Sequence, residues 1–357
     1  MNWRRPYLEG LREGGLPRVG PASVHIDVTN ACNAACVTCW DHSPLLAQAR
    51  PAEWKRQRLS FEAFERVVGE LDALGSVRHV VLSGMGEPLT HPRIYDMIAA
   101  VKARGWELTV ISNLVAADVE RLCASGIDQL LVGVQGVTPE SYTAFHPGWT
   151  ERHFFDLCRI LRALSGTNTR VRHVQVIERD NASEIIEMVR FARSFRADRV
   201  NFKLAALHSG TEACAISEDQ RDWLLTEGVG RARGAAAELG VRTNLDLFET
   251  QLRTGGRSTA PSSAIGCSMG YVFTRITVDL DVLFCCNVNV RVGSLRDAAF
   301  CDLWWGARWQ HLRDELRAGH FFRACDQCGK LEQNARWAQH LAGAPAALDR
   351  ATEPPGA

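Results

Sequence analysis

The sequence predicts an α/β fold in which a parallel sheet curls into a partial barrel and a smaller second domain follows. Three observations carry this prediction. Between Ser23 and Leu204, short apolar, β-branched runs alternate with amphipathic stretches, and this βα unit occurs six times. After Gly240 the composition changes to a Gly/Ser/Thr/Pro-rich segment, and six of the 12 cysteines lie beyond it. Six units suit an incomplete barrel.

Each predicted strand is a short run of buried character, and each is followed by apolar residues spaced three and four apart, as in an amphipathic helix. The six strands are Ser23–Val28, Arg78–Ser83, Glu107–Ser112, Leu130–Gln135, Val171–Ile177 and Arg199–Leu204. In a sheet of this kind, ligands gather at the carboxyl ends of the strands.

The distal part of the chain predicts a small β-hairpin and helix domain. A further helix is expected over 217–240, a strand-turn-strand over 273–286 and a Trp-rich helix over 301–319. We divide the chain into an N-terminal segment (1–22), the barrel (23–240), a connector (241–262), the second domain (263–345) and a disordered tail (346–357).

Composition excludes several classes of protein. The chain has 357 residues with 41 basic and 41 acidic side chains, so we expect no nucleic-acid partner. No apolar run approaches the roughly 18 residues that cross a bilayer, and the amino end lacks the apolar stretch of a signal peptide. We therefore expect a cytoplasmic protein without a membrane partner, whose cysteines serve metal or redox chemistry.

Three cysteines follow the first strand in the spacing C-x3-C-x2-C: Cys32, Cys36 and Cys39. Structural zinc and ferredoxin-like iron-sulfur sites normally use four protein ligands, whereas three thiolates on a 4Fe-4S cubane leave one iron open. The alternatives are a zinc site completed by His25 or His42, and three buried thiols.

This spacing at this place resembles the radical S-adenosylmethionine superfamily, and the resemblance covers about residues 23–204. It implies a TIM-like (β/α)6 partial barrel and a 4Fe-4S cluster whose open iron binds the amino and carboxylate groups of S-adenosylmethionine. One electron from that cluster would cleave the cofactor to methionine and a 5′-deoxyadenosyl radical.

The resemblance also implies cofactor contacts at the ends of later strands. Gly84, Gly86 and Glu87 lie where the family carries a Gly-Gly-Glu segment, and they would hold the methionyl ammonium. Ser112 and Asn113 follow the third strand, at a position from which the family reaches the ribose and the methionyl carboxylate.

Two contacts depart from the common family pattern. Gln135 would replace a carboxylate as a hydrogen-bonding partner of the cofactor, and Trp40 would cover the adenine because Thr38 stands where many relatives have an aromatic residue. For Ser112, Asn113 and Gln135, an N-cap or turn role is the alternative to ligand contact.

A second set of cysteines lies in the distal domain. Cys267, Cys285 and the C-x2-C pair Cys325 and Cys328 resemble the auxiliary-cluster extension called twitch, a shortened form of the SPASM domain. The resemblance implies one auxiliary 4Fe-4S cluster with four protein ligands. A zinc knuckle built from the same thiolates is the alternative.

Two features of this distal set depart from the family. Leu280 occupies a turn position where relatives usually have Gly. Cys286 directly follows Cys285, and because neighbouring strand residues face opposite sides, only one of the two can bind a cluster. We favour Cys285.

Two fates of a substrate radical suggest different catalytic residues. Cys214 lies in a polar loop after the last barrel strand and is a candidate hydrogen donor for epimerisation. Lys203 and His173, on barrel strands, are candidate proton acceptors for net oxidation, in which the auxiliary cluster would take the second electron. Each also has a purely structural alternative.

We expect a radical dehydrogenase of a small polar metabolite, such as an amino sugar, aminocyclitol or nucleoside, in natural-product biosynthesis, reduced by a flavodoxin or ferredoxin. Only about 22 residues precede the first strand, too few for a separate peptide-recognition domain. The alternatives are a radical epimerase or decarboxylase, a peptide-modifying maturase, and a non-catalytic iron-sulfur electron carrier.

Overall fold

The computed structural model describes residues 3–256, 267–322, 325 and 328–343, which fall into two compact units. The barrel unit comprises Ile26–Glu65 and His79–Gly256. The terminal unit comprises the described parts of Met1–His25, Arg66–Arg78 and Arg257–Ala357.

The barrel unit contains a curved, unclosed parallel sheet with the strand order β1-β2-β3-β4-β5-β6-β7. The strands are β1 (Ser23–Asp27, shared with the terminal unit), β2 (His79–Ser83), β3 (Glu107–Ser112), β4 (Gln129–Gly133), β5 (Arg170–Ile177), β6 (Arg199–Leu204) and β7 (Arg242–Thr243). The six predicted strands and the partial barrel are thus confirmed.

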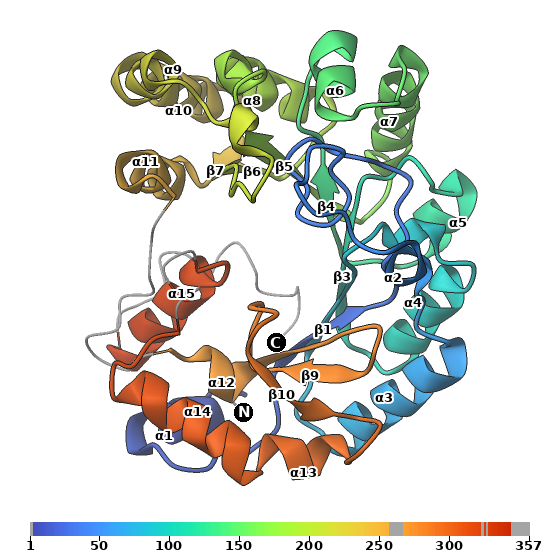
Figure 1. The fold of residues 1–357 in the computed structure, drawn as a ribbon, viewed down its shortest axis with the longest axis vertical. Helices are drawn as coiled ribbons and strands as arrows, with labels where there is room; N and C mark the ends of the chain where they lie inside the picture. The colour runs from blue at the N-terminus through green and yellow to red at the C-terminus, as the bar shows by residue number, and fades with distance from the viewer. Residues whose placement is uncertain (1–2, 257–266, 323–324, 326–327, 344–357) are drawn as a thin grey trace. The chain divides into compact units, whose positions relative to one another are not determined.

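Helices follow the strands and lie on the outer side of the curved sheet (Figure 1). They are α2 (Ala52–Arg56), α3 (Phe61–Ala73, shared with the terminal unit), α4 (Ile94–Ala103), α5 (Val119–Ala124), α6 (Pro139–Phe145), α7 (Glu151–Leu164), α8 (Ile185–Ser194), α9 (Glu218–Trp223), α10 (Val229–Leu239) and α11 (Leu245–Thr254), with short 3-10 turns at Pro88–Thr90, Ala182–Glu184 and Glu212–Cys214. A π-helical turn, Leu224–Gly228, joins α9 to α10, so the helix expected over 217–240 is present.

Alternation along the strands separates an apolar face from a polar one. On β6, Val200 and Phe202 are fully buried in a core that includes Val189 of α8 and Phe248 of α11. The opposite face of β6 carries Arg199, Asn201 and Lys203. β6 therefore packs its apolar face on the helices and turns its polar side chains to the other side of the sheet.

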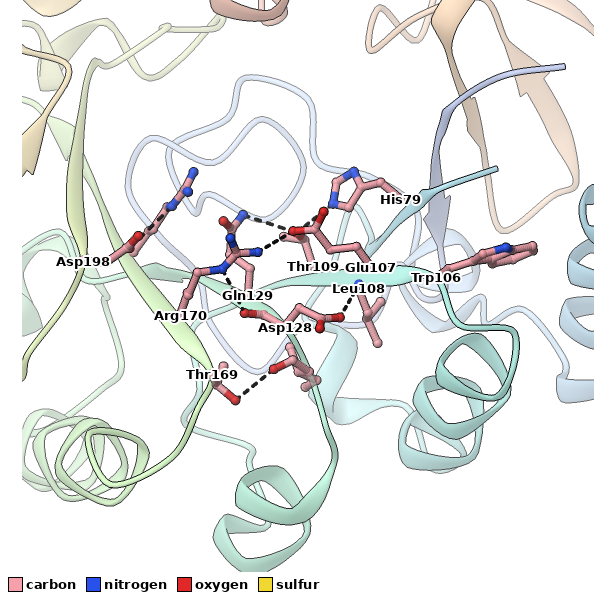
Figure 2. A network of polar contacts seen from close by, with 12 residues as sticks. His79, Trp106, Glu107, Leu108, Thr109, Asp128, Gln129, Thr169, Arg170 and Asp198 are labelled. Carbon is pink, nitrogen blue, oxygen red and sulfur yellow. Dashed lines mark hydrogen bonds and ion pairs between the residues drawn. The ribbon is translucent and has the colours of Figure 1, made fainter. Parts of the chain in front are cut away.

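Polar side chains join the amino ends of neighbouring strands (Figure 2). The Thr109 hydroxyl lies 2.8 Å from His79 Nε2 and accepts a hydrogen bond from Gln129 Nε2 at 3.2 Å. Arg170 forms an ion pair with Glu107. These contacts fasten β2, β3, β4 and β5 to one another at the end of the sheet opposite the predicted ligand site.

Beyond the end of the two-residue strand β7, two side-chain amides pair with the backbone groups at the outer edge of β6. Asn244 Oδ1 accepts from the Phe202 backbone N–H at 2.7 Å, and its Nδ2 donates to the Phe202 carbonyl at 2.9 Å. Gln251 Oε1 accepts from Leu204 N–H at 3.1 Å. The amides of these two side chains thus substitute for a neighbouring strand.

The barrel unit differs from the sequence prediction at two places. β4 ends at Gly133, so Gln135 lies in the following turn and has a positive φ of 57°. Residues 242–254, which we assigned to a connector, instead form β7 and α11, because their apolar side chains, Leu245, Phe248 and Leu252, enter the barrel core. The rest of the connector from 257, and the tail, lie outside the described residues.

The terminal unit combines a small antiparallel sheet, in the order β10-β9-β8, with short helices. Its elements are α1 (Arg5–Glu13), α12 (Met269–Val272), β8 (Phe273–Ile276), β9 (Asp281–Leu283), β10 (Arg291–Ser294), α13 (Phe300–Trp304), α14 (Ala307–Arg317) and α15 (Leu331–Leu341). Arg313 is buried in this unit and donates to the carbonyls of Gly270 and Trp304 at 2.8 and 2.9 Å.

Three details of the terminal unit depart from expectation. A third strand, β10, joins the hairpin, and the Trp-rich helix divides into α13 and α14 at Gly306, where a Cβ would lie 2.5 Å from the Asp302 carbonyl. Cys285 and Cys286 lie beyond the end of β9, so strand alternation does not separate them as we predicted. Leu280 has a φ of 66°, which explains why glycine suits that turn.

Among the described residues, no helix has both the length and the apolar character needed to cross a membrane.

Candidate functional site

The loop after β1 brings the thiols of Cys32, Cys36 and Cys39 close together. Burial raises the pKa of Cys32 to about 12 and also raises the pKa values of Cys36 and Cys39. The charges of Cys39 and Cys32 raise the pKa of Cys36 further. Three thiolates here need a compensating positive charge, which a metal cluster supplies.

The backbone of this loop is arranged to support thiolate ligands. Ala34 N–H donates to Cys32 Sγ at 3.5 Å, and His42 N–H donates to Cys39 Sγ at 3.3 Å. Hydrogen bonds to ligand sulfurs stabilise the thiolate form and tune the potential of a bound cluster. His42 itself is engaged elsewhere, with Nε2 lying 2.9 Å from the Asn30 carbonyl.

Gly84 and Gly86 allow the end of β2 to approach this loop. A Cβ on Gly84 would lie 2.1 Å from the Thr29 carbonyl oxygen, and one on Gly86 would lie 2.1 Å from that of Ala31. Gly86 N–H donates to Thr29 O at 3.2 Å. Both positions therefore need glycine because backbone meets backbone there.

Glu87 is buried at 3% exposure and binds donors of its own chain. Oε1 accepts from Leu89 N–H at 2.9 Å and from Ser112 Oγ at 2.7 Å, and Oε2 accepts from Asn113 N–H at 2.7 Å. Burial raises the Glu87 pKa to about 7 despite these bonds. The carboxylate thus connects the end of β2 to the end of β3. Glu87 also lies beside the cysteine loop, because its N–H donates to the Ala31 carbonyl at 2.8 Å.

Ser112 and Asn113 both have the turn role that we weighed as an alternative. Ser112 Oγ accepts from Leu114 N–H at 2.8 Å, and Asn113 Oδ1 accepts from Val115 N–H at 3.0 Å. Asn113 Nδ2 also donates to Asn33 Oδ1 at 2.9 Å, so this side chain touches the cysteine loop.

A cavity of about 310 Å³ opens beside the cysteine loop at the carboxyl ends of the strands. Its lining combines two thiols, aromatic and apolar groups, one amide and one ammonium: Cys36, Thr38, Cys39, Trp40, Gln135, Phe145, Val176, Lys203, Leu204 and Ala206. The sequence identified five of these; Thr38 was mentioned only as a departure, and Phe145, Val176, Leu204 and Ala206 carry no local signal.

Gln135 and Trp40 occupy defined positions in this cavity. Gln135 Oε1 is buried and has no hydrogen-bond partner among the described residues, while its backbone carbonyl accepts from Asn181 Nδ2 at 2.7 Å. A buried amide oxygen beside two thiols fits a ligand that carries donor groups. Trp40 donates from Nε1 to the Ala206 carbonyl at 2.5 Å and is half exposed.

Comparison with known families bears on this arrangement directly. Residues 26–192, which contain the cysteine loop and β2 to β5, match the family described as the radical SAM superfamily. Residues 26–192 are a radical SAM domain. Members of this family use S-adenosylmethionine and a 4Fe-4S cluster, and the matched residues include the loop with Cys32, Cys36 and Cys39 and the end of β2 with Gly84 and Gly86.

Curated relatives resemble the chain beyond this domain. The mycofactocin maturase MftC of Mycobacterium tuberculosis is 26% identical over 344 residues, covering 92% of this chain and 80% of the relative. The PqqA peptide cyclase of Rhizobium meliloti is 28% identical over 205 residues, 55% of this chain. That alignment spans about half of the cyclase, 51% of its length.

Solved structures share the fold. Streptococcus suis SuiB bound to S-adenosylmethionine has a TM-score of 0.62 and 18% identity, covering 92% of this chain and 75% of that one. The anSMEcpe structure with bound AdoMet has a TM-score of 0.64 and 13% identity, covering 91% and 93%. At these identities, the likeness extends to the fold alone.

The three candidate catalytic residues of the barrel unit lie in different surroundings. Lys203 lines the cavity with Cys36 and Cys39. Cys214 is buried, with Sγ 3.9 Å from the Val37 carbonyl, and is not among the cavity-lining residues. His173 is fully buried on the helix-facing side of β5, where burial lowers its pKa to about 3. Of the three candidate catalytic residues, only Lys203 lines the cavity.

The terminal unit brings a second group of thiols near one another. Burial raises the pKa of Cys267 to about 12, with further contributions from Cys328 and Cys325. A hydrogen bond from Cys285, together with the charges of two nearby cations, lowers the pKa of Cys286 to about 6. A Cβ on Gly329 would lie 3.1 Å from Cys286 Sγ, so Cys286 faces the C-x2-C loop.

Across the described ranges, no group of three or more His, Cys, Asp or Glu side chains has the geometry to hold a single metal ion. A cubane, by contrast, takes each thiolate at a different iron.

Proposed function

We propose that this protein is a radical SAM enzyme that modifies a peptide. The observation that carries the proposal is the alignment with the mycofactocin maturase MftC over 92% of this chain, which continues through the terminal unit. A relative named as a PqqA peptide cyclase and a fold neighbour solved with its precursor peptide SuiA favour the same substrate class. We therefore rank a peptide ahead of the small polar metabolite that we expected from the sequence.

The radical SAM domain would bind its cofactors with the residues of the candidate site. Cys32, Cys36 and Cys39 would hold the cluster, and when bound, this cluster supplies one electron that cleaves S-adenosylmethionine to methionine and a 5′-deoxyadenosyl radical. Gln135 would offer its buried amide oxygen to cofactor donor groups. Lys203 is the cationic group at the cavity wall, suited to bind a carboxylate or to relay a proton.

The backbone around β2 would meet the methionyl ammonium. Glu87 already accepts three hydrogen bonds from its own chain, so we assign it the role of holding the ends of β2 and β3 in place. Gly84 and Gly86 allow the backbone at the end of β2 to lie against the cysteine loop, and backbone carbonyls of this region would accept hydrogen bonds from the ammonium group. Trp40, which is held by its hydrogen bond to the Ala206 carbonyl, would cover the adenine.

The terminal unit would hold an auxiliary 4Fe-4S cluster. Cys267, Cys325 and Cys328 interact with one another electrostatically, and either Cys285 or Cys286 supplies the fourth thiolate. A cluster with all its irons ligated by protein accepts electrons without binding substrate. The chemistry that such a cluster would supply when bound is the acceptance of one electron, as a net oxidation requires, and a flavodoxin or ferredoxin would donate the electron that reduces the first cluster.

The test uses the full chain, reconstituted with iron and sulfide under anaerobic conditions, reduced with dithionite and given S-adenosylmethionine. We expect 5′-deoxyadenosine from the wild type and none from a variant with Cys32, Cys36 and Cys39 changed to Ala. A fully loaded wild type that forms none would instead indicate an electron carrier.

Substrate class is tested by the stimulation of 5′-deoxyadenosine formation. A library of short ribosomal-type peptides is compared with a set of amino sugars, aminocyclitols and nucleosides. We expect stimulation by peptides, with a mass change in the peptide detected by mass spectrometry. Stimulation confined to the small metabolites would return the dehydrogenase of our sequence prediction to first place.

A further inference from the structure

Trp149 lies in the turn between α6 and α7 and reaches the cysteine loop through its indole. Nε1–H donates to the Asn33 carbonyl at 3.0 Å, and Asn33 directly follows Cys32. The indole has a single polar donor, so this bond requires one orientation of the ring.

Two imidazoles fix that orientation. The Trp149 ring stacks on His146 at 4.4 Å with an interplanar angle of 17°, and on His153 at 5.2 Å with an angle of 4°. His146 is buried, and its Nδ1 lies 2.7 Å from the Tyr142 carbonyl. His153 Nδ1 accepts from Thr150 N–H at 3.0 Å at the start of α7. Both rings are thus held by backbone groups.

The same segment contacts the loop on the other side of Cys36. Val37 N–H donates to the carbonyl of Phe145, the last residue of α6, at 3.0 Å. The segment from α6 to α7 therefore holds the loop at Asn33 and at Val37, one position on each side of the central cysteine.

We infer that Trp149, clamped by His146 and His153, is a positioning residue that orders the ligand loop before the cluster binds. The inference rests on the proposed role of Cys32, Cys36 and Cys39 as cluster ligands. Ordering several loop residues costs conformational entropy, and a loop that has already lost that freedom binds its cluster more tightly and releases it more slowly.

The experiment compares Trp149→Phe with Trp106→Phe in the anaerobically loaded full chain. Trp149→Phe keeps an aromatic ring but removes the N–H group. Trp106 is buried in the barrel unit, directly before β3, whereas Trp149 is half-buried, so a Trp→Phe change at Trp106 is the control for the loss of an indole away from the cysteine loop. The readout is the loss, during exposure to an iron chelator, of the electron paramagnetic resonance signal that changes when S-adenosylmethionine is added.

We expect Trp149→Phe to lose this signal about fivefold faster than the wild type, the effect of one hydrogen bond, and Trp106→Phe to match the wild type. His153→Ala, which keeps the N–H but removes one stacking ring, should show a smaller acceleration. Equal rates in Trp149→Phe and Trp106→Phe would overturn the inference. A wild type without any signal that responds to S-adenosylmethionine would instead count against the cluster assignment itself.

Discussion

At Glu87 the carboxylate is occupied by Leu89, Ser112 and Asn113, two of which come from the end of a different strand. The motif located this residue correctly beside the cysteine loop. It did not reveal the partners, because they depend on the parallel pairing of β2 with β3, which brings together residues about 25 positions apart. The same holds for Gln135, whose place in the cavity depends on a turn with positive φ.

Changing Glu87 to Gln should destabilise the barrel unit. A carboxamide has one oxygen and one NH2 group, so at least one of the donors that now meet the carboxylate loses its acceptor. We expect the free energy of unfolding to fall by about 1–3 kcal/mol, measured by urea denaturation. Glu140→Gln on the exposed first turn of α6 is the control and should change stability little. Equal stability of the two variants would contradict this role of Glu87.

Glu178 should make stability depend on pH. It is 1% exposed, Oε1 accepts from Asp180 N–H at 3.0 Å, and burial raises its pKa to about 7. Because the folded state keeps the proton where the unfolded chain has lost it, the contribution of Glu178 to stability is greatest below about pH 4.5 and is lost as the pH rises to about 7.

The Glu178→Gln variant should lack this part of the pH dependence. We expect the fall in unfolding free energy between pH 4.5 and 7 to be smaller in the variant than in the wild type, by up to about 3 kcal/mol. The exposed Glu120→Gln serves as control and should keep the wild-type slope. An unchanged slope in Glu178→Gln would show that the carboxyl ionises normally.

At the scale of elements, the strands of the barrel were predictable because each carries its own apolar periodicity, and their carboxyl ends were predictable as the ligand site. Element boundaries were less so. β7 has only two residues, and α11 follows it at once, so no turn or composition signal separates them from a connector. In the terminal unit, the hairpin was evident, but β10 contains a Gly and an Arg that weaken its strand pattern.

The approach of β2 to the cysteine loop should depend on Gly86. In Gly86→Ala, the new Cβ would lie 2.1 Å from the Ala31 carbonyl oxygen, so the backbone has to move. We expect the variant to retain less than half of the iron of the wild type at the first site, as measured by iron analysis and by the response to S-adenosylmethionine.

Gly230→Ala in α10 provides the comparison, since a Cβ there meets no atom within 4 Å. Alanine in a helix interior should leave iron binding intact and raise stability by about 0.5–1 kcal/mol. If Gly86→Ala binds iron as well as Gly230→Ala, the close backbone approach is not required for the cluster.

On the scale of the whole molecule, the two sets of cysteines lie in different compact units. The first set was predicted to hold a cluster from its spacing, its place after the first strand and its resemblance to the radical S-adenosylmethionine superfamily. The fourth ligand of the second set was not recognisable from the sequence, because adjacent Cys285 and Cys286 both lie in an irregular segment after β9 that the sequence presented as strand. The substrate class was also beyond the sequence, since it depends on relatives rather than on a local motif.

Iron counting should separate the two clusters. The loaded wild type should contain about eight irons per chain, and removal of Cys32, Cys36 and Cys39 should leave about four, because each cubane holds four. A Cys267→Ser variant should also fall to about four while keeping the signal that responds to S-adenosylmethionine. About four irons in the wild type would rule out the auxiliary cluster.

The side chains of Asn244 and Gln251 limit how a peptide, our proposed substrate, could bind to the edge of β6. An incoming extended chain binds a sheet by pairing with free backbone groups at its edge. Both backbone groups of Phe202 and the N–H of Leu204 are already taken by amides of the same molecule. A peptide of the proposed substrate class therefore has no free backbone groups to pair with at Phe202 and at the Leu204 N–H of β6. Because these backbone groups are already paired, this edge of the sheet is also protected against aggregation through edge-to-edge strand pairing.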